Sequence, residues 1–89
     1  MVVIDHYGNL ISDLEAQEVA DAGACQVRLS GRILPLRRTY GDAAPGEALG
    51  LINSFGLLEV AVNGGSAART LGVGRGETVE LSRDIVVRS

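Results

Sequence analysis

The chain has 89 residues and a net charge of −3, and 46% of its residues are hydrophobic although it holds only two Tyr, one Phe and no Trp. A chain of this length forms one small domain, residues 1–89, whose thin core must be built from Val, Leu, Ile and Ala. Its basic residues are all Arg and are scattered apart from Arg37-Arg38, which argues against nucleic-acid binding.

The opening of the chain predicts a strand, a turn and a helix. Val2-Val3-Ile4 indicates a buried strand, and because it begins at once we expect that further chain normally precedes it. Tyr7-Gly8-Asn9 is typical of a turn. Ser12 and Glu15 have capping-box spacing, which predicts a helix from there to about Ala22.

The middle of the chain predicts four strands. Residues 25–29 alternate as Cys25, Val27 and Leu29 against polar neighbours, which is typical of a half-buried strand. Pro35 cannot donate to a ladder, so the strand around it is expected at an edge. Ala48–Ile52 is apolar and predicts a central strand, and residues 58–62 predict the next one.

The last part of the chain predicts a short helix at Ser66–Leu71, closed by Gly72, and a strand at residues 78–82. Ile85-Val86-Val87 is either a last short strand or a tail. About six short strands with Gly-rich turns and one or two short helices indicate an all-β, mainly antiparallel fold, a small β-barrel. We expect no internal repeat.

Cysteine usage and hydropathy suggest the compartment. The single Cys25 excludes an internal disulfide and suits a reducing environment. No apolar run approaches the roughly 20 residues that span a bilayer, and no signal peptide is visible. We therefore expect a cytoplasmic protein without a membrane partner. No Cys/His cluster has metal-ligand spacing, so no metal site is predicted.

The three aromatic residues, Tyr7, Tyr40 and Phe55, all flank Gly-rich turns. They either form a stacking platform for a flat ligand such as a nucleobase or simply pack beside the turns. In the same way, Asn63-Gly64-Gly65-Ser66 either brings backbone N–H groups close to a ligand or is a hairpin exit with Ser66 as N-cap. His6 as a lone general base is the less favoured reading, and Arg37-Arg38 indicates a solvated edge.

Three segments, taken in order, resemble the C-terminal domain of the S-adenosylmethionine hydroxide adenosyltransferase family, relatives of fluorinase and chlorinase. The segment from Val3 to Ile11 resembles the family's opening strand and turn, and residues 39–42 (Thr-Tyr-Gly-Asp) resemble its aromatic-bearing loop. The block from Ile52 to Ala68 is similar to the family's most specific motif. The correspondence runs from Val2 to about Leu81.

The resemblance implies binding roles at both ends of S-adenosylmethionine. Asp5 and Ser54 match positions that hold the methionine amino and carboxylate groups. Phe55, next to Ser54, occupies a position where fluorinase has an Arg, and Val62 occupies the position of a second fluorinase Arg. Because both Arg residues are missing, the resemblance disfavours halide chemistry.

At the adenine end, the resemblance implies that Tyr7 and Tyr40 sandwich the ring. Asn9 matches an amide that hydrogen-bonds the adenine edge, and Asn63 and Gly64 match backbone that reads the amino group and ring nitrogens.

The family reaction displaces methionine at the ribose C5′ of S-adenosylmethionine by water and yields adenosine and methionine. In the family, an N-terminal α/β domain supplies the ribose-binding Asp and the water-activating residues, and the site forms between subunits of a trimer. That domain is absent from this sequence. We therefore expect an isolated C-terminal domain with no catalytic residue and no cofactor, which binds S-adenosylmethionine or adenosine weakly and is inactive alone.

Two alternatives remain open. The chain could be an autonomous small β-barrel that acts as an oligomerisation or interaction module without catalysis. It could also pair in trans with a separate N-terminal subunit.

Overall fold

The computed structural model describes residues 2–82, so the strand or tail considered at Ile85-Val86-Val87 lies outside the described part. The described chain forms seven strands, two short α-helices and one 3₁₀ turn. In chain order they are β1 (Val2–Ile4), β2 (Leu10–Glu15), α1 (Ala16–Asp21), β3 (Gln26–Leu29), β4 (Arg32–Pro35), η1 (Tyr40–Asp42), β5 (Ala48–Ile52), β6 (Leu57–Val62), α2 (Ala67–Leu71) and β7 (Val79–Ser82).

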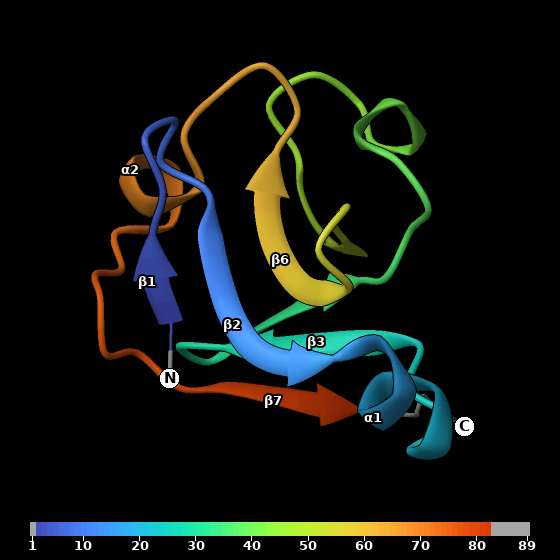
Figure 1. The fold of residues 1–89 in the computed structure, drawn as a ribbon. Coiled ribbons are helices and arrows are strands. Elements are labelled where there is room, and N and C mark those ends of the chain that lie inside the picture. Colours follow the sequence, from blue (N-terminus) through green and yellow to red (C-terminus); the bar gives the residue numbers. More distant parts are fainter. Residues whose placement is uncertain (1, 83–89) are drawn as a thin grey trace.

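The strands form two antiparallel sheets, one with the order β1-β2-β6-β5 and one with the order β4-β3-β7. Figure 1 shows the strands of the second sheet crossing beneath those of the first. The all-β, antiparallel class is therefore confirmed.

The prediction of a barrel is wrong, because the two sheets are joined at their margins without closing. On one side the link is a single bridge between Leu36 and Gly50, next to a hydrogen bond from Arg37 N–H to the Gly50 carbonyl (2.8 Å). Pro35 has no N–H and ends β4 just before this bridge. On the other side, Val2 N–H donates to the carbonyl of Glu77, in the loop before β7 (3.0 Å).

The main core lies between the sheets and is aliphatic. Its largest fully buried side chains are Val2, Leu10, Val27, Leu29, Leu58 and Val60. Gly50 lies where the sheets come closest, because a Cβ there would be 2.8 Å from Val27 Cγ2 and 3.1 Å from Leu36 Cδ2. This glycine is therefore required by packing.

The predicted helix start at Ser12 is wrong, because residues 10–15 form strand β2. The register against β6 shifts between Ile11 and Glu15, and Ser12 fills the irregularity. Its buried hydroxyl donates to the Leu58 carbonyl (2.8 Å) and accepts from Leu14 N–H (3.1 Å). Helix α1 starts one turn later, where the Glu18 carboxylate accepts from Glu15 N–H (2.9 Å). A contact with a distant strand thus overrode the local capping pattern.

Three further expectations are corrected. Strand β5 is at the edge of its sheet and not central, and it is buried because the segment that contains Ala43 packs over its outer face. In β1 only Val2 is buried, while Val3 and Ile4 are exposed. Cys25 precedes β3 and is exposed.

Other expectations are confirmed. Strand β4, which contains Pro35, is an edge strand. Helix α2 has Ser66 as its N-cap, with the hydroxyl accepting from Arg69 N–H, and Gly72 as a left-handed C-cap at φ 69°. The two α-helices of the described chain have six and five residues, far short of what a membrane crossing requires.

Candidate functional site

Two turns of the first sheet have the same construction. Asp5-His6-Tyr7-Gly8-Asn9 joins β1 to β2, and Asn53-Ser54-Phe55-Gly56-Leu57 joins β5 to β6. Each begins with Asp or Asn, carries an aromatic residue at its third position and has a glycine at positive φ next (85° and 79°). The two turns therefore share one local construction.

The first residue of each turn organises it through its side chain. The Asp5 carboxylate oxygen Oδ1 accepts from the N–H groups of Tyr7 and Asn9, both at 2.9 Å, and Oδ2 accepts from Asn9 Nδ2 at 3.2 Å. The Asn53 amide oxygen likewise accepts from the N–H groups of Phe55 (2.9 Å) and Leu57 (3.1 Å). These side chains replace backbone partners that the tight turns cannot provide.

Each turn is fixed against the first turn of a helix. The Gly8 carbonyl accepts from Ala68 N–H of α2 at 2.9 Å, and the Gly56 carbonyl accepts from Ala16 N–H of α1 at 2.8 Å. Figure 1 shows the β1–β2 turn beside α2. The aromatic side chains of the turns point to solvent, with Tyr7 76% exposed and Phe55 86% exposed. The fold thus holds the backbone of both turns while leaving their aromatic rings accessible.

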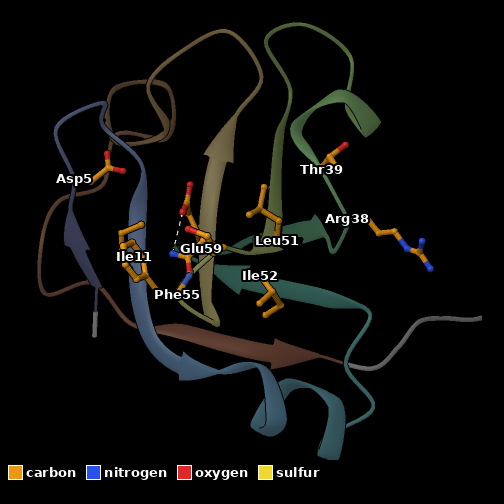
Figure 2. A pocket seen from close by; sticks show the side chains of 10 residues that line it. Asp5, Ile11, Arg38, Thr39, Leu51, Ile52, Phe55 and Glu59 are labelled. Atoms are coloured by element: carbon orange, nitrogen blue, oxygen red, sulfur yellow. Dashed lines mark hydrogen bonds between the residues drawn. The ribbon is translucent and has the colours of Figure 1, made fainter.

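Between the two turns lies a cleft of about 530 Å³ on the outer face of the first sheet. Its floor is a row of paired residues across three strands, Ile11 of β2, Glu59 of β6 and Leu51 of β5. Figure 2 shows Glu59 in the middle of this cleft, with Asp5 toward one end and Thr39 on the opposite side. The full lining is Asp5, Ile11, Arg38, Thr39, Leu51, Ile52, Asn53, Ser54, Phe55 and Glu59.

A second, more open depression of about 630 Å³ lies on the other side of the first turn. Asp5 lines both hollows. The depression is lined by Ile4, Asp5, His6, Tyr7, Gly8, Ser66, Ala68 and Arg69. An elongated ligand could therefore occupy both hollows while contacting the Asp5 turn between them.

The structure brings four of the eight predicted residues together around these hollows. Asp5, Ser54 and Phe55 line the cleft, and Tyr7 lines the depression. Asn9 ends the same turn as Tyr7, with its amide nitrogen engaged by Asp5.

Asn63 and Gly64 line neither hollow. Tyr40 begins η1 directly after Thr39, a lining residue of the cleft. The Asn63 side chain donates to the Ala43 carbonyl (2.8 Å), and its backbone N–H donates to the Glu47 carbonyl (3.1 Å), so these donors hold the loop before β5. Gly64 is exposed at φ 79° and leaves its surroundings open to close approach.

The glycine-rich stretch before α2 serves as a hairpin exit with Ser66 as N-cap, the second of the two alternatives considered for it. Arg69 N–H donates to the Ser66 hydroxyl and Ala68 N–H donates to the Gly8 carbonyl. These two donors of the first helical turn are used within the protein, as the alternative with Ser66 as N-cap predicts.

His6 and Arg38 each border one of the two hollows. His6 is exposed in the depression and meets Tyr7 edge-on, with ring centroids 5.1 Å apart. Arg38 lines the cleft, but Figure 2 shows its side chain extending away from it. Among residues 2–82 no group of three or more His, Cys, Asp or Glu is placed to hold a metal ion.

Sequence reasoning missed the floor of the cleft, above all Glu59. In a strand with apolar residues on both sides, alternation predicts that this position faces solvent, yet Glu59 is only 4% exposed. The sequence does contain one indication of its role: all five remaining residues of β6 are apolar. A charged residue in such a strand needs a partner or a ligand to explain it.

The comparisons with known proteins agree with one another. Residues 1–80 match the model of the SAM hydroxide adenosyltransferase C-terminal domain. The (R)-S-adenosyl-L-methionine hydrolase of Thermus thermophilus is 40% identical over 81 residues, which are 91% of this chain and 30% of that protein. The enzyme of the same name from Salinispora tropica is 34% identical over 88 residues, covering 92% of this chain and 31% of that protein.

Two solved structures share the fold. An uncharacterized conserved protein from Thermotoga maritima superposes with a TM-score of 0.77 and 27% identity over 89% of this chain and 33% of its own. A conserved hypothetical protein from Thermus thermophilus gives a TM-score of 0.72 and 37% identity over 90% of this chain and 33% of its own. The chain thus spans about a third of each relative's length. With a family match over nearly all of its residues, the chain belongs to the SAM hydroxide adenosyltransferase C-terminal domain family.

Proposed function

We propose that this domain forms one wall of an S-adenosylmethionine-hydrolysing site and binds the methionine and adenine ends of the substrate. The observation that carries the proposal is the position of Asp5, which lies between a cleft and a depression that each hold other predicted binding residues. The hydrolases with which the chain shares 34–40% identity act, by their names, on this substrate.

The cleft fits the methionine end. Asp5 places a carboxylate at one side of it, which suits the ammonium group of the ligand. Ser54 places an exposed hydroxyl on the opposite turn, within the part of the cleft that would receive the carboxylate. Ile11, Leu51 and Phe55 provide apolar surface for the methylene groups.

The depression fits the adenine end. Tyr7 offers an exposed ring on which a base can stack, an interaction that contributes about 1–3 kcal/mol per base. Asn9 lies two residues further in the same turn, and the family resemblance assigns further adenine contacts to the backbone of Asn63 and Gly64, in the stretch that leads into α2.

In this proposal, water activation belongs to an N-terminal α/β domain, and the complete site lies between subunits of an oligomer. The relatives are about three times as long as this chain, which leaves room for such a domain. A single wall must offset the cost of immobilising the ligand with few contacts, so its affinity is expected to be near or weaker than millimolar, about −4 kcal/mol. The reaction would be attack of water at the ribose C5′, with methionine leaving and adenosine formed.

The test is a titration of the ¹⁵N-labelled chain with S-adenosylmethionine, adenosine and L-methionine, followed by amide chemical shifts. Adenosine is expected to shift Tyr7, Asn9 and Gly64, L-methionine to shift Asp5 and Ser54, and S-adenosylmethionine to shift both groups. A micromolar dissociation constant would contradict the one-wall proposal, and the absence of any shift at about 10 mM ligand would overturn binding itself. In parallel, the chain alone should release no adenosine.

Exposed apolar residues on the edge strand β1 favour a second candidate, an oligomerisation module without catalysis. Val3 and Ile4 are exposed there, and unpaired edge strands associate readily. Sedimentation at several concentrations separates the two functions. A stable dimer or trimer whose thermal stability ignores adenosine favours this candidate, whereas stabilisation by adenosine favours the binding wall.

A further inference from the structure

We propose that Glu59 is a positioning residue: it fixes the side-chain amide of Asn53 and thereby the turn that presents Ser54 and Phe55 to the ligand. The proposal rests on the function proposed above for that turn, and it assigns a role to the buried carboxylate on the floor of the cleft. Glu59 lies in the centre of the floor row and is only 4% exposed.

A carboxylate in this position is costly unless it is used. Its strand neighbours Leu58 and Val60 are fully buried in the core, and its lateral partners across the sheet are Ile11 and Leu51. Burial of a charge among aliphatic groups is unfavourable without hydrogen-bonding partners. An apolar residue would fill the floor row at lower cost, so the carboxylate points to a specific task.

That task follows from the contact with Asn53. Glu59 Oε1 accepts from Asn53 Nδ2 at 3.2 Å, the dashed line in Figure 2. An ionised carboxylate only accepts hydrogen bonds, so it selects the orientation in which the amide NH₂ faces it. The Asn53 amide oxygen is then directed toward the N–H groups of Phe55 and Leu57, where it accepts both hydrogen bonds.

The opposite orientation would break the turn. It would place the NH₂ group against two backbone donors, Phe55 N–H and Leu57 N–H, and leave all of them without acceptors. Glu59 thus decides between a closed turn and an open one, although it does not belong to the turn.

The matching turn at Asp5 shows why a second residue is needed here. Asp5 has two equivalent oxygens and closes its turn without outside help. An Asp at position 53 could do the same, but it would place a negative charge next to Ser54, where the methionine carboxylate is proposed to bind. A neutral Asn oriented by a more deeply buried carboxylate closes the turn and keeps that charge off its exposed side.

The experiment compares Glu59→Leu, which removes the acceptor, with Glu59→Gln, which retains an oxygen that can accept from Asn53. Glu80→Leu is the control, because Glu80 is an exposed strand glutamate of the other sheet. Two properties are measured by NMR on the full chain: hydrogen exchange of the Phe55 and Leu57 amides without ligand, and the dissociation constants of L-methionine and adenosine.

We expect Glu59→Leu to accelerate exchange at both amides about tenfold and to weaken L-methionine binding about fivefold or more, with adenosine changed less than about twofold. Glu59→Gln is expected to restore both properties, and Glu80→Leu to leave both unchanged. A domain destabilised as a whole would lose protection everywhere and would weaken both ligands alike. If Glu59→Leu does not fold, Glu59→Met carries the same test, because it also removes the acceptor for Asn53 Nδ2 and keeps an unbranched side chain of similar length.

Wild-type exchange and wild-type L-methionine affinity in Glu59→Leu would overturn the proposal, and so would a Glu59→Gln variant as impaired as Glu59→Leu. If the unmodified chain binds neither ligand, the proposed function fails, and the exchange of the Phe55 and Leu57 amides still decides whether Glu59 positions the turn.

Discussion

The sharpest test of the proposed site is Asp5→Asn, because this substitution separates the charge of Asp5 from its role in the turn. An Asn at this position keeps one oxygen that can accept from Tyr7 N–H and Asn9 N–H, which both contact Oδ1 at 2.9 Å. The bond between Oδ2 and Asn9 Nδ2 can be replaced by rotating the Asn9 amide, which then accepts from the new NH₂ group. The turn is therefore expected to persist without its negative charge.

The expected magnitudes follow from these contacts. Hydrogen bonds to a charged acceptor contribute about 1.5–3 kcal/mol and those to a neutral one about 0.5–1.5 kcal/mol, so two weakened backbone bonds cost about 2–3 kcal/mol before solvent screening. Asp5 is partly exposed, and solvent screening reduces this loss to about 1 kcal/mol. An ammonium about 4 Å away loses about 1–4 kcal/mol of attraction. With a loss of about 1–2 kcal/mol from that range, the dissociation constant of S-adenosylmethionine rises about 5- to 30-fold.

The assay is the NMR titration with S-adenosylmethionine and with adenosine, which lacks the ammonium group. Asp42→Asn is a matched control, because the Asp42 carboxylate also accepts two backbone hydrogen bonds, from Arg38 N–H and Thr39 N–H, both at 3.2 Å, without lining the cleft itself. It changes the net charge by the same amount. S-adenosylmethionine binding is expected to weaken in Asp5→Asn alone, and adenosine binding to change less than about twofold in both variants.

Equal weakening of the two ligands by Asp5→Asn would refute the reasoning, since Asp5 would then act only by shaping the turn under Tyr7. Unchanged binding of S-adenosylmethionine would refute it as well, because the cleft would not then receive the ammonium group.

Three further substitutions test the fold and the site. Ser12→Ala removes the partner of the Leu58 carbonyl and of Leu14 N–H, and should lower the free energy of unfolding, measured with urea, by about 2–4 kcal/mol. A loss below about 0.5 kcal/mol would show that water replaces the hydroxyl. Gly8→Ala places a side chain at a positive φ, and its Cβ would collide with the Ser66 side chain, so the free energy of unfolding should fall by about 2–4 kcal/mol. A variant as stable as the parent would mean that the turn does not need its contact with α2. Tyr7→Ala should change stability by less than about 0.5 kcal/mol but weaken adenosine about fivefold or more, and unchanged adenosine affinity would remove Tyr7 from the adenine site.

The sequence predicted only part of the candidate site. Local Gly and Asx patterns identified the two turns and the aromatic residues Tyr7 and Phe55 that they present, and the family resemblance added Asp5 and Ser54. The sequence did not identify Glu59, whose importance depends on a cleft built from three strands. Nor could it show that the amide of Asn63 is engaged by the Ala43 carbonyl, since that contact joins residues 20 positions apart.

For the fold, the sequence by itself determined features that depend on near neighbours. The alternation in β3 and β7, the edge position of β4 at Pro35, and the caps of α2 at Ser66 and Gly72 all follow from patterns a few residues long. Tertiary structure alone decided whether the sheets close, that β5 lies at an edge and whether residues 12–15 form a helix. The last case gives the physical reason: Ser12 can cap a helix locally, but its hydroxyl instead bonds to Leu58, 46 residues away, because pairing β2 with β6 buries far more apolar surface than a helical turn would.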